Sequence, residues 1–144
     1  MGKTMVRLFG CVAFSMMVLW SSVLWTGAAQ AQTAGSLSDR ERQLMGIAAS
    51  CVAFYQAAMA ELELPIEGNE AKRQTFLSVF DTLAKRGHSQ KEYEAAFQRD
   101  VVMRTIEVTT ILENDPQTAR PQVLGNLPKC DGFLEEMKTV AGLT

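Results

Sequence analysis

Apolar positions between Ser38 and Leu64 recur with the period of an α-helix that is buried on most of its sides. At 100° per residue, the larger apolar side chains share one face of this helix. They are Leu44, Ile47, Ala48, Cys51, Tyr55, Ala58 and Leu62. The opposite face carries small residues, which allow a second helix to approach closely: Gly46, Ala49, Ala53, Ala57 and Ala60. The pattern therefore predicts the central helix of a bundle over residues 38–64.

Local signals define both ends of this first helix. Ser38 and Glu41 stand three positions apart and predict a capping box, in which each side chain accepts a hydrogen bond from the backbone N–H of the other. Pro65 ends the helix, because the residue before a proline avoids the helical conformation.

Two further helices are predicted in the middle of the chain. One covers 70–86, with Asn69 as its N-cap and Gly87 in the left-handed conformation just beyond its end. The other covers 90–113. Its stretch 105–111 is rich in β-branched residues and alone would favour a strand, but the helical period persists on both sides of it. Its expected core face is Tyr93, Phe97, Val101, Val108, Ile111 and Leu112.

The last third of the chain contains several residues that interrupt helices. Pro121 and Gly125 limit the stretch 116–125 to a short helical turn in our interpretation. A last helix over 128–142 then starts with a proline at its first position. Its apolar face is Cys130, Phe133, Leu134, Met137 and Ala141.

Together these patterns predict an all-α fold, a small four-helix bundle over 38–64, 70–86, 90–113 and 128–142. It forms a single domain over 38–144, preceded by a short flexible lead at 32–37. No internal repeat and no low-complexity segment divides the sequence.

The first 31 residues have the organisation of a secretory signal peptide. Two basic residues, Lys3 and Arg7, precede an apolar run over 8–25, and Ala29-Gln30-Ala31 provides a small-residue cleavage site. We expect cleavage of 1–31 and a periplasmic or secreted protein. The alternative is an uncleaved anchor, because the apolar run is just long enough to span a bilayer.

The net charge of the chain limits the classes of molecule that it can be expected to bind. Removal of residues 1–31 leaves 113 residues and takes the net charge from −2 to −4. A mildly acidic domain without a basic run is a poor binder of nucleic acid. After signal cleavage, no segment is apolar and long enough to cross a membrane.

Two cysteines remain after cleavage, Cys51 and Cys130, and each lies at the centre of an apolar helix face. An even cysteine count in an exported protein favours a disulfide. A loop of 79 positions gives a stabilisation of roughly 4–5 kcal/mol in the chain-entropy model. The alternative, a redox pair, usually takes the form C-x-x-C, which is not present.

One polar group falls on the apolar side of the third predicted helix. Arg104 lies between Val101 and Val108, and Asp100 lies one turn before it in position for an ion pair. In the simpler interpretation, the stem of Arg104 covers apolar surface while its head reaches water. In the alternative, Arg104, Asp100 and the Tyr55 hydroxyl form a buried polar spot in a ligand pocket.

The same helix is apolar on a second side. Val102, Met103 and Ile106 lie roughly opposite its core face and are candidates for an interface with a protein partner or a second copy. No nucleophile motif, phosphate-binding loop or cofactor motif is present, and the single histidine, His88, has no neighbour at metal-ligand spacing. We therefore expect no catalytic residues, no metal site and no cofactor.

These observations favour an exported, non-enzymatic helical bundle that acts by protein–protein interaction, in an inhibitor, immunity or chaperone-like role. The alternative is a periplasmic bundle that binds a small ligand in a pocket near Tyr55 and Arg104. An enzyme ranks third, because no set of residues at catalytic spacing supports it.

Overall fold

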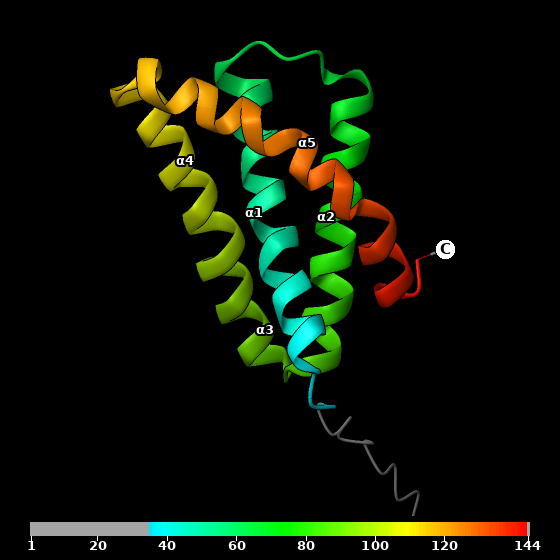
Figure 1. Cartoon of the computed structure of the whole chain (residues 1–144). Coiled ribbons are helices and arrows are strands. Elements are labelled where there is room, and N and C mark those ends of the chain that lie inside the picture. The colour runs from blue at the N-terminus through cyan, green and yellow to red at the C-terminus, as the bar shows by residue number, and fades with distance from the viewer. Residues whose placement is uncertain (1–34, 144) are drawn as a thin grey trace, which may run out of the picture.

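The computed structural model describes residues 35–143, which form helices and no strand. The helices are α1 (Asp39–Glu61), α2 (Ile66–Gly87), α3 (Gln90–Ala96), the π-helical segment η1 (Phe97–Val102), α4 (Met103–Asn114) and α5 (Pro116–Ala141). α3, η1 and α4 follow one another without a break and form a single long rod (Figure 1). The described part of the chain is therefore a bundle of four helical rods, which confirms the predicted fold class.

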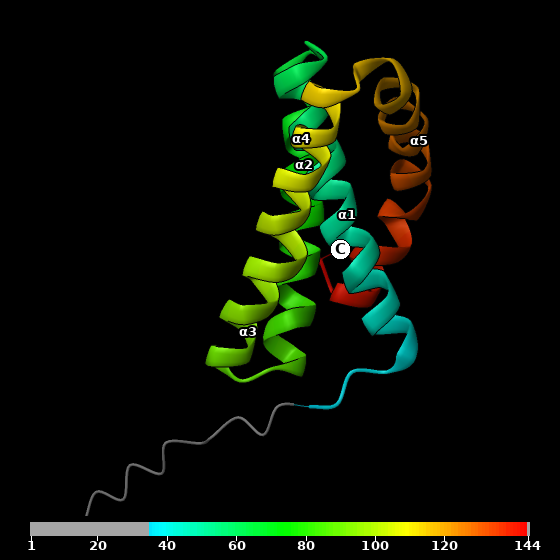
Figure 2. The ribbon, with the colours of Figure 1, turned by 90° about the vertical axis from the view of Figure 1, so that its left-hand side faces the viewer.

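α1 is the central helix, as its pattern predicts. It lies between α4 and α2, and α5 crosses over it obliquely (Figure 1). A quarter turn away, α1 stands between α5 and the pair formed by α2 and α4 (Figure 2). Both of its faces are used, so the small residues at 49, 53 and 57 are as buried as the larger ones. The largest fully buried side chains of the core are Tyr55, Phe76, Phe80, Leu44, Leu83 and Met137.

The start of α1 is more ordered than expected. The capping box of Ser38 and Glu41 is present, but Leu37, which belongs to the predicted flexible lead, is only 6% exposed. Leu37 packs against Gly87, where an added Cβ would lie 2.5 Å from the Leu37 Cγ. The left-handed conformation predicted for Gly87 is wrong: the residue ends α2, and it must be small because Leu37 needs the space.

α2 begins with an irregular turn. Glu67 and Gly68 are not helical, and Gly68 has φ +78°, a value that glycine adopts without strain. The regular helix starts just after them, close to the predicted position. Asn69 does not act as the expected cap; its side-chain amide donates to the carbonyl oxygen of Pro65 instead, at 2.7 Å.

The third rod covers the predicted range, and its β-branched stretch is helical as expected. The π-helical segment within it was not predicted. Tyr93, Phe97, Val101 and Thr105 follow in three steps of four residues, and each such step in an α-helix rotates the side chain by about 40°. The wider turns of η1 offset this rotation and keep the stripe on the core. Ile111, expected in the core, is 49% exposed, because Leu112 occupies the core position.

The prediction for the last third of the chain is wrong. Residues 116–125 and 128–142 form no separate turn and helix; α5 runs without interruption, with Pro121 and Pro128 inside it. Its buried residues continue at steps of three and four through both prolines, so burial of the stripe outweighs the lost backbone hydrogen bonds. That stripe is Ala119, Val123, Leu127, Cys130, Met137 and Ala141.

The sequence led to two predictions about membranes, one on the signal peptide and one on the rest of the chain. The proposed signal peptide and its cleavage site lie outside the described residues. Within them, the prediction that no segment is apolar and long enough to cross a membrane is wrong, because α1 meets both conditions by length and composition alone. Most of its apolar side chains are buried against the other helices, and a helix in the core of a bundle passes the same test of length and composition.

Candidate functional site

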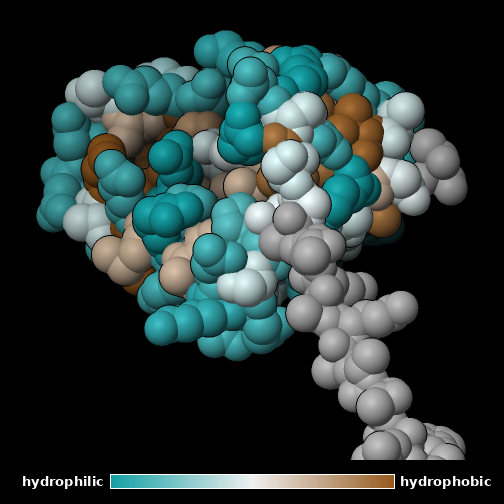
Figure 3. All heavy atoms as spheres, turned by 90° about the horizontal axis from the view of Figure 1, so that it is seen from below, coloured by the Kyte–Doolittle hydropathy of each residue, from teal (hydrophilic) through white to brown (hydrophobic). Residues whose placement is uncertain are grey.

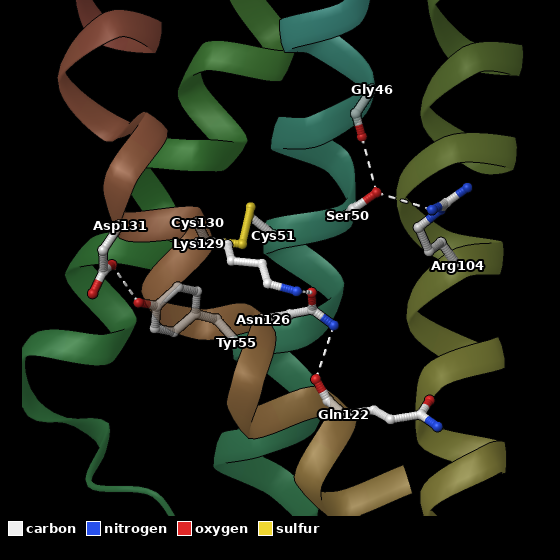
Figure 4. The surroundings of a disulfide bond; sticks show 10 residues. All are labelled: Gly46, Ser50, Cys51, Tyr55, Arg104, Gln122, Asn126, Lys129, Cys130 and Asp131. Atoms are coloured by element: carbon white, nitrogen blue, oxygen red, sulfur yellow. Dashed lines mark hydrogen bonds between the residues drawn. A yellow bond between two sulfur atoms is a disulfide. The ribbon is translucent and has the colours of Figure 1, made fainter.

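The predicted disulfide is present and joins α1 to α5. Cys51 and Cys130 are both buried, and their Cα atoms are 5.7 Å apart across a sequence separation of 79. A buried disulfide of this kind is typical of a protein from an oxidising compartment. It also brings Tyr55, one turn after Cys51, close to Asp131, which directly follows Cys130 (Figure 4).

Tyr55 lies one turn after Cys51 and is part of a polar cluster that joins three helices. Its hydroxyl donates to Asp131 Oδ1 at 2.5 Å, while Lys72 Nζ donates to Asp131 Oδ2 at 2.7 Å. The Lys72 ammonium also lies 5.8 Å from the centre of the Tyr55 ring. We refer to Tyr55, Asp131 and Lys72 as the three-helix cluster.

Electrostatics within the three-helix cluster favour a charged carboxylate and a neutral phenol. Burial and the hydrogen bond to Asp131 raise the pKa of Tyr55. Burial alone would raise the pKa of Asp131, but the hydrogen bonds from Lys72 and Tyr55 outweigh it and hold that pKa below its usual value. Tyr55 is only 1% exposed, so it contributes to helix packing, while the side chains of Lys72 and Asp131 are 38% and 39% exposed.

The polar spot predicted from Tyr55, Asp100 and Arg104 does not form. Arg104 is exposed and donates to Ser50 Oγ at 2.9 Å, on the other side of α1 from Tyr55 (Figure 4). Asp100 pairs with its neighbour Arg99 at 2.7 Å, and no ion pair to Arg104 is present. Asp100 lies in η1, where the four-residue spacing of an α-helical ion pair does not apply. The simpler interpretation of Arg104 fits this geometry.

The candidate interface residues lie on the surface, as the sequence suggests. Met103 and Ile106 are each 53% exposed, and Val102 is half-buried beside them. The end of the bundle seen in Figure 3 is mostly hydrophilic, with apolar residues in separate patches. Among residues 35–143, the other exposed large apolar residues are Ile66, Ile111, Leu124 and Leu143, and Met103 and Ile106 are two that lie on the same side of one helix.

A groove lies directly beside these residues, between α1, α2 and the rod of η1 and α4. Its volume is about 290 Å³. Val102 and Ile106 line it, so two of the three candidate interface residues belong both to the groove and to the outer surface. The remaining lining residues are Val52, Gln56, Arg73, Leu77, Phe97, Val101 and Thr105.

The charge at the groove is already neutralised from within the bundle. Arg73 pairs with Glu70 at 2.6 Å, and the hydrogen bonds from Arg73 and Gln74 lower the pKa of Glu70 to about 2. The groove therefore presents an apolar floor to any occupant, with few polar groups at its edge. A smaller groove of about 150 Å³ lies on the other side of α4, against α5, and is lined in part by Ile111.

A second polar cluster, which sequence reasoning missed, joins the end of α2 to α3. Asp81 accepts a hydrogen bond from the Tyr93 hydroxyl and one from Lys85 Nζ, at 2.6 Å for the latter. The Lys85 ammonium lies 5.1 Å from the centre of the Tyr93 ring. The hydrogen bond to Asp81, with burial, raises the pKa of Tyr93 to about 12. We refer to Asp81, Lys85 and Tyr93 as the local cluster, because its members are at most 12 positions apart.

Neither cluster is arranged to bind a metal ion. No group of histidine, cysteine or carboxylate residues with metal-binding geometry occurs between residues 35 and 143. His88 lies at the end of α2, where its Nδ1 is 3.1 Å from the carbonyl oxygen of Ala84. No protein-family model matches this sequence, and no curated protein or solved structure matches it significantly.

Proposed function

We propose that this protein is exported and acts, without catalysis, by binding another protein through the outer side of η1 and α4. The observation that carries the proposal is the pair Met103 and Ile106, apolar and half exposed beside an apolar groove. Burial of such side chains is the main favourable term in protein association. An inhibitor, immunity or chaperone-like role would use such a surface.

Two further features support export and a non-enzymatic role. The disulfide fits an oxidising compartment, in line with a signal peptide over 1–31 that would release the protein into the periplasm or the medium. The hydroxyl, carboxylate and ammonium groups of both polar clusters are bonded to one another, so they serve to join helices.

In vivo photo-crosslinking tests the proposal. A photoreactive residue replaces Thr110, which is exposed on the same side of α4 as Met103 and Ile106. The matched control replaces Ile66, an exposed apolar residue at the start of α2. We expect protein adducts from position 110 that are lost in the Ile106→Glu background, and no such adducts from position 66. The absence of adducts at position 110 would contradict protein binding at this face.

The groove itself favours a second candidate function, binding of a small apolar ligand. Its volume of about 290 Å³ is close to the lower end of ligand pockets, and aliphatic and aromatic side chains dominate its lining. This site replaces the pocket expected near Tyr55 and Arg104, since neither residue lines it. Mass spectrometry of small molecules released from the denatured protein tests it, with Val101→Trp as the variant that fills the groove and loses the ligand.

A further inference from the structure

The outer side of the third rod carries a charge at each end of its apolar centre. Arg99, Met103, Ile106, Thr110 and Glu113 follow in steps of four, three, four and three residues. The last four lie in α4, where these steps keep side chains on one side of the helix, and Arg99 lies about one turn earlier, in η1. All five residues are exposed. We refer to these five residues as the outer stripe. Arg99, which is paired with Asp100, lies at the η1 end, Met103 and Ile106 form the apolar centre, and Glu113 lies at the end of α4.

This order of charges makes the outer stripe complementary to itself in one orientation only. Arg99 and Glu113 each lie seven positions from Ile106, in opposite directions. Two copies that pack antiparallel about Ile106 therefore place Arg99 of each copy against Glu113 of the other. A parallel arrangement places like charges together at both ends, which opposes association.

The charged groups at the two ends have capacity for new contacts. The Arg99 side chain is 69% exposed, and its pair with Asp100 uses Nε and Nη2, so Nη1 can still donate. Glu113 makes no ion pair within residues 35–143. From Met103 to Glu113 the outer stripe runs about 15 Å at 1.5 Å per residue, and Arg99 extends it by a further turn into η1, a length that allows a helix–helix contact of several turns.

We infer that the occupant of the outer stripe is a second copy of this chain, packed antiparallel about a two-fold axis through Ile106. The inference rests on the proposed function, because it names the protein that binds there. Such a contact is isologous: the same patch serves both copies. Its apolar centre and charged ends also match the usual division of an interface into core and rim.

Sedimentation over a range of protein concentrations at low salt, with the exported protein, tests the inference. We expect a monomer–dimer equilibrium that Ile106→Glu abolishes and the matched control Ile66→Glu leaves unchanged. Arg99→Glu and Glu113→Arg should each raise the dissociation constant roughly tenfold, because each puts like charges together at both ends of the contact. The double variant Arg99→Glu with Glu113→Arg should restore the wild-type constant, with the two charges exchanged.

Several outcomes would overturn the inference. A monomer at every concentration removes the second copy as occupant, and a double variant as weak as the single ones removes the antiparallel arrangement. Circular dichroism melts of each variant identify any that fail to fold. Arg99→Glu and Glu113→Arg test the same contact, so either one serves if another variant is affected.

Crosslinking at position 110 distinguishes the failure of the inference from the failure of protein binding. An adduct with twice the mass of the chain supports both. An adduct of any other mass upholds protein binding at this face and overturns self-association. The absence of any adduct contradicts both.

Discussion

α5 and α4 pack on different sides of α1, and different kinds of contact attach them. α5 is joined to the core by the disulfide and by the three-helix cluster, in which Tyr55 and Asp131 are 76 positions apart in sequence. α4 is attached through apolar packing and the exposed hydrogen bond of Arg104 to Ser50. The outer side of α4 carries Met103 and Ile106, each 53% exposed, while the apolar stripe of α5 faces inward and Leu124 is its exposed large apolar residue.

The comparison shows how one small bundle separates stability from binding. A covalent bond and the three-helix cluster, in which Tyr55 is buried, hold one side independently of what covers the other. The rod of η1 and α4 then does not need all of its apolar surface for the core. Its π-helical segment, a feature frequently found at functional sites, lines the groove through Phe97, Val101 and Val102.

The largest expected effect breaks the covalent attachment of α5. The variant Cys51→Ala with Cys130→Ala should lower the free energy of unfolding by roughly 2–5 kcal/mol, because the unfolded chain is no longer constrained. Denaturant unfolding of both proteins measures the difference. Thiol titration of the wild-type protein under denaturing, non-reducing conditions is the control. Two reactive thiols per chain would show that the disulfide does not form in the exported protein.

The next effect compares the two tyrosines. Tyr55→Phe should lower the free energy of unfolding by about 1.5–3 kcal/mol, because a buried hydroxyl loses a hydrogen bond to a charged group. Tyr93→Phe removes the same kind of bond from the less buried local cluster and should cost below about 1 kcal/mol. Chemical denaturation of the two variants measures the contrast. Equal losses would show that the long-range cluster is no more important than the local one.

Alkaline titration sharpens the same comparison, because these are the two tyrosines of the chain. Both pKa values are raised in the folded state, that of Tyr93 to about 12, so the clusters contribute fully below pH 10. Their contribution is lost as the pH rises through the folded-state values. Absorbance of tyrosinate should stay low at pH 11 in the folded protein and be high in denaturant. Ionisation of one tyrosine near pH 10 would identify the cluster that is open in solution.

The smallest effect concerns Arg104, on the side of α4. Arg104→Met keeps most of the packing of the stem and loses one exposed hydrogen bond, so stability should change by less than about 1 kcal/mol. Adding Asp100→Leu should recover nothing, since Asp100 pairs with Arg99. Denaturant midpoints of the single and double variants test this. A large loss of stability in Arg104→Met that the double variant recovers would show that Arg104 and Asp100 form an ion pair in solution, contrary to the structure.

Much of the local architecture could be predicted from the sequence. The start of α1, the helical state of the β-branched stretch and the disulfide all follow from spacing within a few residues or from the cysteine count. The exposed side of α4 also follows, because its apolar residues lie away from the core stripe. The π-helical segment had a signal in the three steps of four residues from Tyr93 to Thr105, which a fixed period of 3.6 overlooks.

The sequence by itself determined the features whose energy is local, namely the capping box of Ser38 and Glu41 and the apolar periods of the helices. It also limited the disulfide to one pair of cysteines after cleavage. Only the tertiary structure decided which distant group each polar side chain meets, as with Tyr55 and Asp131. It also decided that α5 continues through Pro121 and Pro128, because burial along the whole stripe outweighs the local cost of each proline. Likewise, Gly87 is small because Leu37 packs on it, a contact between residues 50 positions apart that no local pattern records.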